Sequence, residues 1–438
     1  MVRFYQPPKK QSASSKHQSL TIERLDHHGA GIAYQGQYPI FVDGALPQEE
    51  VVVQVTEKKN KYARARLIKV NTASRERVAP TCPYYEQCGG CDLQHLSYSA
   101  QQQHKQETLK QLMQKFAGAP ASLSLEPLIA GEAWHYRRRT RLSALSKQGR
   151  FHLGFRQRKN NTVIDIEHCP VLDARLNTIL AELKAMIVAL KFTAAVGHIE
   201  LVLADNGPCI LFRLVKTLPE PTAQRVRDWC LERGAQLFFD FGEGVVEPKL
   251  SDWPFYQEAG AKIPFLPGQF IQVNQSVNQA MVSQAIDWLA PTAQDTILDL
   301  FCGLGNFSLP LATKARHVTA VEGVASMVKA AQNNARQQGF DNVDFYHANL
   351  ESPLSMHSWA KGTFDKVLLD PARAGAAGIV EQLAQLGVKR VVYVSCNPAT
   401  LARDSQQLFE QGFRLEKLGA LDMFPHTSHL ESMALFTR

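Results

Sequence analysis

Hydrophobic and polar positions alternate in short runs near the start of the chain. Such runs lie at 19–22, 31–34, 40–42 and 51–55, and glycine-bearing turns separate them. Alternation over a few residues is typical of half-buried strands, because successive side chains of a strand point to opposite faces. Four such strands within about fifty residues predict a small β-barrel over 17–70.

After residue 271 continuous apolar runs replace the alternating ones. Short runs rich in Val, Leu and Ile indicate buried strands, and stretches of helical periodicity lie between them. Strands are predicted at 297–301, 318–321, 367–369 and 391–394, and helices at 272–290 and 325–338. This order is the signature of a parallel sheet, so 271–438 is expected to form a doubly wound α/β domain.

The middle of the chain mixes both patterns. Helices are predicted at 96–116 and 181–190 and strands at 198–203 and 210–214, which makes 71–270 a central α+β domain. The first 16 residues are basic and rich in Ser and Gln, and we expect them to form a disordered tail. Because they contain no apolar core of a signal peptide, a cytoplasmic protein is expected.

Charge divides the chain unevenly. The net charge is +7 for 438 residues, but 1–170 carry +11 and 171–438 carry −4. A basic front half attached to a nearly neutral back half suggests a polyanion-binding portion joined to an enzymatic one. The sequence contains no run of about 18 apolar residues, which argues against a membrane span.

The highest density of positive charge lies between 137 and 164. This segment has nine Lys or Arg residues and no acid, with aromatic residues interleaved, and a second basic turn lies at 58–66. Basic groups neutralise phosphates and aromatic rings stack on bases, so RNA is the expected partner. The alternative is a solvated hairpin without a ligand. Phe270 is a further candidate for stacking on a base.

A glycine turn follows the strand at 297–301. Gly303 and Gly305 allow a ligand to approach the backbone, and Glu322, about twenty residues on, suits ribose hydroxyls. A dinucleotide fingerprint requires Gly or Ala where this chain has Ser308, and it places a pyrophosphate at the helix N-terminus. S-adenosylmethionine has no phosphate and tolerates a bulkier loop, so it is the expected cofactor.

Cys396 stands at the carboxyl end of the strand at 391–394, where open α/β sheets place their ligands. We interpret it as a nucleophile, against the alternative of a small buried hydrophobe. Cys302, inside the glycine turn, is the rival nucleophile. The segment 424–433 offers His426, His429 and Glu431 as partners.

Three cysteines cluster at Cys82, Cys88 and Cys91, and Cys169-Pro170 lies far downstream. This C-x5-C-x2-C spacing with a remote Cys-Pro resembles a 4Fe–4S site, whereas zinc sites usually combine two pairs of ligands. Zinc and unliganded cysteines remain alternatives, and His168 is a rival ligand. Cys209 and Cys230 lie in apolar or helical contexts and are expected in the core.

Several motifs resemble known families. The Gly29-Ala-Gly-Ile-Ala33 and Gly44-Ala-Leu-Pro47 elements resemble a TRAM domain, an OB-like RNA-binding barrel. The C-terminal domain resembles class I methyltransferases. Four motifs resemble the uracil-C5 RNA methyltransferases: Asp299-Leu-Phe-Cys-Gly-Leu-Gly305, Asp370-Pro-Ala-Arg373, Ser395-Cys-Asn-Pro398 and His426-Thr-Ser-His-Leu-Glu431. The combination of barrel, cysteine cluster and catalytic domain resembles the bacterial 23S rRNA (uracil-5-)-methyltransferase family.

This resemblance implies a function and a set of site residues. The implied activity is transfer of a methyl group from S-adenosylmethionine to C5 of a uridine in 23S rRNA, through a covalent bond between Cys396 and C6. Glu431 is the implied base, with His426 and His429 either orienting it or capping the loop. The implied cofactor contacts are Gln272, Phe301, Asn306, Glu322, Asn349 and Asp370. The alternatives are methylation of tRNA or another rRNA site, and an iron–sulfur RNA-binding protein without activity. A monomer is expected.

Overall fold

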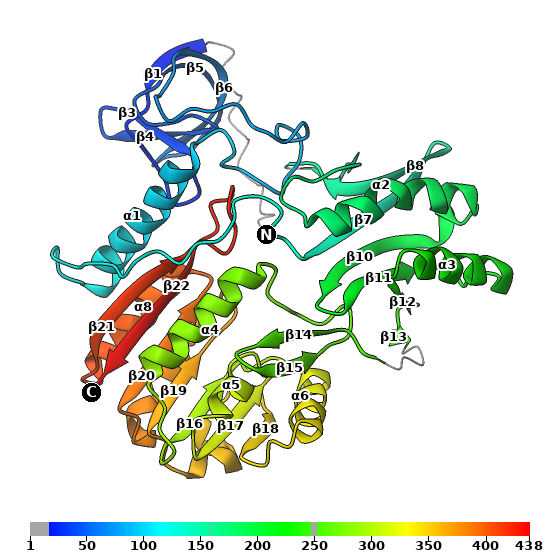
Figure 1. Ribbon diagram of the computed structural model, residues 1–438. Coiled ribbons are helices and arrows are strands. Elements are labelled where there is room, and N and C mark those ends of the chain that lie inside the picture. The colour runs from blue at the N-terminus through cyan, green and yellow to red at the C-terminus, as the bar shows by residue number, and fades with distance from the viewer. Residues whose placement is uncertain (1–16, 159, 247–251) are drawn as a thin grey trace, which may run out of the picture. The chain divides into compact units, whose positions relative to one another are not determined.

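The structure is a computed structural model that describes residues 17–158, 160–246 and 252–438 (Figure 1). The tail that we expected to be disordered lies outside these residues. Internal contacts divide the chain into two units, and each is described by itself. The first contains the chain up to Tyr85, Cys91–Thr108 and His426–Ser428, and the second contains Glu86–Gly90, Leu109–Pro425 and His429–Arg438.

A rolled six-stranded sheet forms most of the first unit (Figure 1). Its strands are β1 (His17–Thr21), β2 (Arg24–Leu25), β3 (Gly31–Gln35), β4 (Tyr38–Asp43), β5 (Glu50–Lys58) and β6 (Ala63–Thr72), in the order β1-β5-β6-β4-β3-β2. Alternate residues, such as Ile40 and Val42 of β4 and Val51 and Val53 of β5, fill its small core. The period-two pattern of the sequence therefore corresponds to the inward face of this sheet. Helix α1 (Tyr98–Ala117) begins in this unit.

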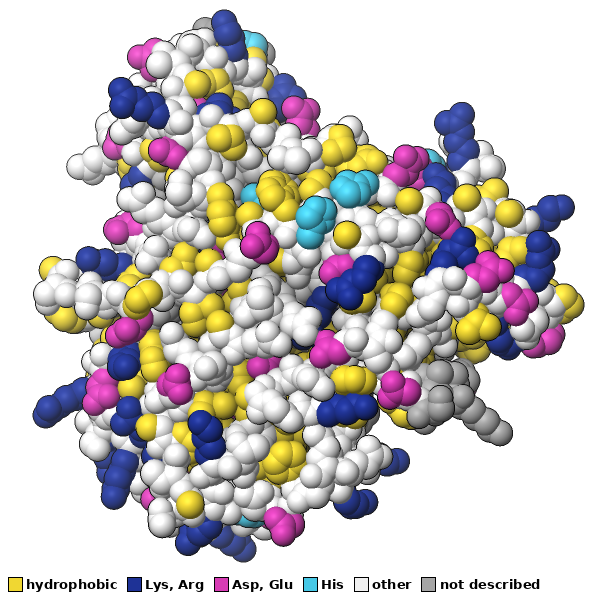
Figure 2. Space-filling model, in the orientation of Figure 1, with side chains coloured by type: hydrophobic (Ala, Val, Ile, Leu, Met, Phe, Trp, Pro, Cys, Tyr) yellow, Lys and Arg dark blue, Asp and Glu magenta, His cyan; other side chains and the backbone are white. Residues whose placement is uncertain are grey.

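A second sheet of seven strands lies in the second unit. Its strands are β7 (Arg139–Lys147), β8 (Arg150–Arg156), β9 (Val163–Asp165), β10 (Val196–Ala204), β11 (Gly207–Leu214), β12 (Gln236–Asp240) and β13 (Val245–Val246), in the order β13-β12-β11-β10-β7-β8-β9. Helix α2 (Ala174–Ala189) contacts β10, and α3 (Glu220–Glu232) contacts β12. The short helix η1 (Thr193–Ala195) and the hairpin of β14 (Phe255–Glu258) and β15 (Ala261–Pro264) complete this region. Lys and Arg side chains project at the end of the β7–β8 hairpin (Figure 2).

The third sheet, also in the second unit, is doubly wound. Its strands are β16 (Thr296–Leu300), β17 (His317–Glu322), β18 (Val343–His347), β19 (Lys366–Leu369), β20 (Arg390–Ser395), β21 (Arg414–Leu421) and β22 (Glu431–Thr437). The order is β18-β17-β16-β19-β20-β22-β21, with β16 to β20 parallel and β22 antiparallel to both of its neighbours. Its helices are α4 (Gln275–Leu289), α5 (Ser308–Ala312), α6 (Ala325–Gln337), α7 (Ala377–Val380), α8 (Pro398–Glu410) and the short η2 (Leu354–Met356), η3 (Ser358–Lys361) and η4 (Leu383–Leu386).

Two cores cover the two faces of this sheet. Val392 and Val394 of β20 join the core that contains buried residues of α4, α5 and α6. Val391 and Tyr393 of the same strand join the core that contains buried residues of α7 and α8. Because both faces are covered, the strand is apolar from Val391 to Val394, which explains the continuous apolar run in the sequence. The predicted fold class is confirmed.

The ends of two predicted helices differ from those in the structure. The helix predicted at 181–190 begins already at Ala174, and the helix predicted at 272–290 begins at Gln275, where Asn274 caps it. Asn274 accepts a hydrogen bond from the backbone of Val277, which satisfies one N–H group of the first turn. Among the described residues, no helix is long and apolar enough to cross a membrane.

Candidate active site

Two neighbouring strands bring Cys396 and Glu431 together. Strand β20 ends at Ser395, and β22, which begins at Glu431, runs antiparallel to it with Ser395 opposite Ser432. Cys396 directly follows Ser395 and Glu431 directly precedes Ser432, so the two residues lie at the same end of this strand pair. They are close enough for the Glu431 charge to act on the Cys396 thiol. The nucleophile and the base predicted from sequence are therefore neighbours at one edge of the sheet.

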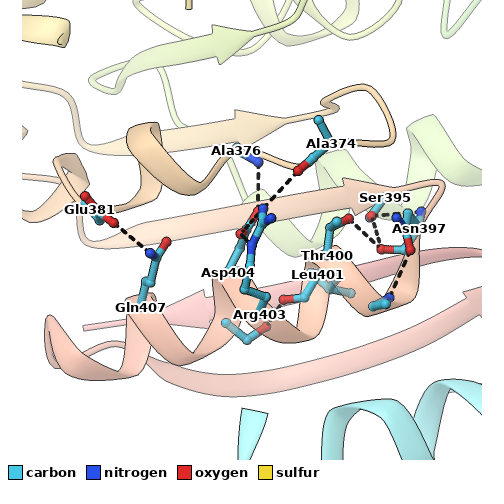
Figure 3. Close-up of polar contacts among 12 residues, drawn as sticks. Ala374, Ala376, Glu381, Ser395, Asn397, Thr400, Leu401, Arg403, Asp404 and Gln407 are labelled. Atoms are coloured by element: carbon cyan, nitrogen blue, oxygen red, sulfur yellow. Dashed lines mark hydrogen bonds and ion pairs between the residues drawn. The ribbon is translucent and has the colours of Figure 1, made fainter. Parts of the chain in front are cut away.

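The backbone around Cys396 is held by its two neighbours (Figure 3). The Ser395 hydroxyl accepts a hydrogen bond from the Asn397 N–H at 3.1 Å and donates one to the Asn397 carbonyl at 3.0 Å. Asn397 is the cap of α8 and accepts from the Ala399 N–H at 3.2 Å. Pro398 then opens the helix, where its missing N–H costs nothing. Cys396 thus lies at a fixed junction between strand and helix, half-buried.

Asp370 lies at the same edge, one strand away. Its strand, β19, pairs with β16 on one side and β20 on the other, with Leu369 opposite both Leu300 and Tyr393. The Asp370 N–H donates to the Leu300 carbonyl at 3.3 Å. Since parallel strands end at the same edge, the loop that begins at Asp370 emerges beside Cys396.

The electrostatics of this edge are dominated by acidic groups in a desolvated site. Burial, then Asp370, raises the pKa of Glu431 to about 8, and burial raises the pKa of Asp370 to about 7. Burial, then Glu431 and Asp370, raises the pKa of Cys396 to about 11. Arg373 is the positive group that opposes these effects at both Glu431 and Cys396. The thiol is therefore protonated in the protein without substrate, and Arg373 favours its ionised form.

The glycine turn takes the conformation that its residues predict. Gly303 and Gly305 have φ of 57° and 93°, and Phe301, between the strand and the turn, has φ of 67°. The carboxylate of Glu322 accepts hydrogen bonds from the Gly303 N–H at 3.1 Å and the Val324 N–H at 2.9 Å. Glu322 therefore fixes the turn as well as standing at the end of β17, where ribose hydroxyls would lie.

Ser308, the residue that departs from a dinucleotide fingerprint, has a buried partner. Its hydroxyl donates to Asp299 at 2.5 Å, and both side chains are fully buried. Burial raises the pKa of Asp299 to about 7, and Asp370 and Glu322 add to the effect while Ser308 opposes it. A smaller residue at 308 would leave this buried carboxyl without its hydroxyl donor.

The remaining predicted cofactor residues lie on separate segments. Asn306 exchanges hydrogen bonds with Asn278 at 3.1 Å in both directions. The Gln272 carbonyl accepts from the guanidinium of Arg138 at 2.9 Å. Asn349 is exposed just after β18 and accepts from the Glu351 N–H at 3.0 Å. Phe301, Glu322, Asn349 and Asp370 follow adjacent parallel strands, so the structure places these four at one edge of the sheet.

Three residues of the basic and aromatic region are buried, contrary to the RNA-binding role predicted for this region. Arg138 is only 3% exposed, because its guanidinium bonds to Gln272 and lies 4.8 Å from the centre of the Tyr256 ring. It serves the interior and is not available to an RNA backbone. Tyr136 and Phe151 are also buried, so they cannot stack on bases. The exposed basic residues of the segment are Arg141, Lys147, Arg150 and Arg156, whereas Lys159 lies outside the described residues. Phe270 is 61% exposed.

The cysteines fall into three groups. Cys209 and Cys230 are buried and burial raises the pKa of each to about 12, which confirms their assignment to the core. Cys302 is 3% exposed, and burial raises its pKa further, so it is less suited than Cys396 to attack a substrate.

The third group comprises the four predicted cluster ligands. Cys82 and Cys91 belong to the first unit and Cys88 and Cys169 to the second, and all four are half-buried. In the described part of the chain, no group of three or more His, Cys, Asp or Glu side chains is arranged to hold a metal ion.

The two histidines near Glu431 have different surroundings. His426 belongs to the first unit, where its N–H donates to the side chain of Gln101 at 2.9 Å. His429 is exposed and its ring centre lies 5.7 Å from that of Phe424. The charged groups that act on Glu431 are Asp370 and Arg373. The role of Arg373 was visible in the sequence only as part of the Asp370–Arg373 motif.

Dinucleotide-binding domains and class I methyltransferases share a doubly wound sheet with a glycine turn after its first strand and an acid at the end of the second. Comparison with solved structures assigns this chain to the methyltransferase fold. A solved structure of the Pyrococcus abyssi tRNA (uracil-54, C5)-methyltransferase in complex with S-adenosyl-L-homocysteine matches 96% of this chain and 100% of its own, with a TM-score of 0.74 and 24% identity. The family model described as tRNA (Uracil-5-)-methyltransferase matches residues 262–438, and the TRAM domain model matches 15–68.

Close relatives define the family more narrowly. The chain is 53% identical over 440 residues to the 23S rRNA (uracil(1939)-C(5))-methyltransferase RlmD of Vibrio parahaemolyticus, with 100% of both chains covered. It is 48% identical, again over 100% of both chains, to the protein of the same name from Aliivibrio fischeri. The chain belongs to the 23S rRNA (uracil-C5)-methyltransferase family.

Proposed function

We propose that this protein transfers a methyl group from S-adenosylmethionine to C5 of a uridine in 23S rRNA, and that it does so in the cytoplasm as a monomer. The observation that carries the proposal is that Cys396 and Glu431 lie at the same end of the β20–β22 pair, with Asp370 close enough to act on both. A thiol and a carboxyl side by side are the two groups that methylation at a pyrimidine C5 requires. Membership in the family identifies the RNA.

Cys396 and Glu431 have successive roles in the proposed reaction. C5 of uracil is a poor nucleophile, so the Cys396 thiolate first adds to C6, which moves an electron pair towards C5. S-adenosylmethionine would supply the methyl group that C5 then takes, and the residues that would hold it are named below. Glu431 takes the proton from C5, the bond between Cys396 Sγ and C6 breaks, and the electron pair returns to sulfur. The ring double bond is restored and the thiolate is regenerated.

Burial of Glu431 serves the third of these steps. A carboxylate with a pKa of about 8 is a stronger base than an exposed one, and its pKa lies near the working pH. The same burial raises the pKa of Cys396, so the site needs a positive group to favour the thiolate. Arg373 is that group in this proposal.

The cofactor residues divide by chemistry. Glu322 presents a carboxylate where ribose hydroxyls would lie, and Asn349 presents an amide beyond the next strand. Phe301, Asn306, Gln272 and Asp370 would hold the remainder, with Asp370 nearest to the reacting base. Asn306 is supported for this by its paired hydrogen bonds to Asn278.

Release of tritium from RNA labelled at C5 of uridine tests the proposal. Wild type with S-adenosylmethionine should release tritium from 23S rRNA, and Cys396→Ala should lower the rate by about 10³-fold or more, because the covalent step is lost. Cys230→Ala is the matched control, since it removes a buried thiol of α3 that is not part of the proposed site. If wild type releases tritium from neither 23S rRNA nor tRNA, the enzymatic proposal is wrong; release from tRNA alone would reassign the substrate.

A second variant separates the base from the nucleophile. Glu431→Gln keeps the shape of the side chain but cannot take the C5 proton, so the methylated base should stay attached to Cys396. The expected result is a protein–RNA adduct that survives denaturing gel electrophoresis. A fully active Glu431→Gln protein without adduct would remove Glu431 from the mechanism.

We also propose that Cys82, Cys88, Cys91 and Cys169 bind a 4Fe–4S cluster, which would act structurally because methyl transfer is redox-neutral. The support is the ligand spacing, together with two local features. The Gly90 N–H donates to the Cys88 sulfur at 3.4 Å, as N–H groups do to ligating thiolates, and Asn177 holds the backbone of Cys169.

Anaerobic purification followed by iron, sulfide and zinc analysis tests this assignment. About four iron and four sulfide per chain are expected for wild type, and Cys88→Ala should lose both. Cys209→Ala, a buried cysteine outside the set, should keep both. Stoichiometric zinc without sulfide would replace the cluster by a zinc site, and a metal-free active protein would remove both.

A further inference from the structure

Asp404 is a buried carboxylate that the proposed reaction does not use. It lies on α8, eight residues after Cys396, and its side chain is fully buried. Burying a carboxylate is costly unless charged and polar partners surround it. Its partners come from α8, from β20 and from the loop 370–376 that follows β19. Figure 3 shows those of α8 and the loop.

One carboxylate oxygen of Asp404 joins two of these elements. It accepts a hydrogen bond from the Tyr393 hydroxyl at 2.7 Å and one from the Ala376 N–H at 2.7 Å. Tyr393 is fully buried in β20, and burial and Asp404 raise its pKa, so its hydroxyl remains a donor. The end of the loop 370–376 is thereby bonded to the strand that leads to Cys396.

The other oxygen binds Arg403, which contacts the loop a second time. The Arg403 guanidinium lies 2.6 Å from Asp404 and donates to the Ala374 carbonyl at 2.9 Å. Gly375 passes between these contacts with φ of 79°, and a Cβ there would lie 2.6 Å from both the Arg403 and Asp404 side chains. The loop therefore approaches the pair so closely that only glycine fits.

The loop has a further attachment next to the nucleophile. The side-chain amide of Asn397 donates to the Arg373 carbonyl at 2.9 Å. The loop contains Asp370 and Arg373, whose charges act on Cys396 and Glu431. Hydrogen bonds hold its backbone at Arg373, Ala374 and Ala376. The Asp370 N–H is bonded to the Leu300 carbonyl of β16, so a shift of the rest of the loop would move Arg373 away from the thiol while Asp370 stays in place.

We propose that Asp404 and Arg403 are positioning residues that fix the loop 370–376, so that Arg373 stays close enough to Cys396 to favour the thiolate. This inference rests on the proposed function, because it assigns Asp404 and Arg403 to the site of Cys396 and Glu431. The pair itself touches neither substrate nor reacting atoms.

Alkylation of Cys396 tests this inference without any methyl transfer. Iodoacetamide reacts with the thiolate, so at a pH well below the thiol pKa the rate reports the thiolate fraction. Arg403→Gln and Asp404→Asn should slow alkylation of the Cys396 peptide, measured by mass spectrometry at pH 8, by about threefold or more, the factor for half a pKa unit. They should also lower kcat/KM for methyl transfer by about 10- to 100-fold, the effect of a small misplacement of reacting groups.

The direction of the alkylation change separates positioning from general loosening. A loop that merely opened would expose Cys396 and speed its alkylation. Gln407→Ala is the matched control, because Gln407 lies on the same helix and donates to Glu381 at 2.7 Å without contacting the loop 370–376 (Figure 3). It should keep the wild-type rate in both assays. The Arg403 side chain is 47% exposed, so its replacement should disturb folding less than replacement of the buried Asp404. Arg403→Gln therefore provides the test if Asp404→Asn does not fold.

The possible outcomes are distinct. An unchanged or faster alkylation rate in folded Arg403→Gln would overturn the inference. A slower rate in a protein whose wild type transfers no methyl group would support the positioning role and reject the proposed function. If wild type transfers methyl groups and the Arg403 and Asp404 variants behave like it in both assays, the proposed function stands and the positioning role is rejected.

Discussion

At the scale of single residues, the site gains its chemistry from where carboxyl groups are buried. Glu431 is 6% exposed, and burial and then the nearby Asp370 raise its pKa, while burial alone raises the pKa of Asp370, so both keep a proton to a higher pH than free carboxyls do. Arg373 opposes this effect at Glu431 and at Cys396. The same burial thus raises the pKa of the Glu431 carboxyl, which makes it a stronger base, and the pKa of the Cys396 thiol, which makes it harder to ionise.

This environment predicts the pH dependence of the reaction. In the proposed reaction Glu431 takes a proton only after losing its own, and its pKa is raised to about 8, so kcat should rise steeply with pH up to about 8. Above that pH the rise should become less steep, because only ionisation of the Cys396 thiol, with a pKa of about 11, still contributes. The check is tritium release between pH 6 and 9.5 under saturating substrate. Arg373→Met should move the inflection upward, because Arg373 lowers the pKa of Glu431. A rate that is flat from pH 6 would show that Glu431 is not the titrating base.

At the scale of elements, the parts that sequence could predict are those with a repeating pattern. Apolar runs predicted β16, β17, β19 and β20, and the residues that follow those strands lie at one edge of the sheet, since parallel strands end at a common edge. The order of the strands is a matter of pairing between distant segments. Neither the apolar pattern of β20 nor that of β22 reveals that the two strands pair antiparallel. This pairing is what brings Glu431 to the end of the sheet where Cys396 lies.

The same limit explains what was missed. Arg138 was counted with its basic neighbours because local charge says nothing of burial, yet the structure bonds it to Gln272, more than a hundred residues away. Asp404 carries no signal in the sequence, because its partner Ala376 contributes only a backbone N–H. Interactions made by the backbone, or between segments far apart, require the folded chain.

At the scale of the whole molecule, charge is the property most relevant to an RNA substrate. Residues 1–170 carry a net charge of +11. In the structure, fewer of these basic side chains are exposed to a polyanion than the sequence suggests. Arg138 is buried, and Arg139 forms an ion pair with Glu200 at 3.1 Å. Lys147 and Arg150, at the turn between β7 and β8, are exposed. We expect this turn to carry phosphate contacts.

The salt dependence of RNA binding provides the test. Each phosphate contact that is lost should lower the slope of log affinity against log salt by about 0.7 to 0.9, because fewer counterions are released. Lys147→Ala with Arg150→Ala should therefore reduce the slope by between one and two units, roughly, as measured by titration of a 23S rRNA fragment at several salt concentrations. The matched control is Arg225→Ala with Lys314→Ala, which removes the same charge from other exposed positions of this unit. Equal slopes for the two double variants would mean that net charge, and not the hairpin, determines binding. A smaller slope for the hairpin variant alone would place the RNA backbone against β7 and β8.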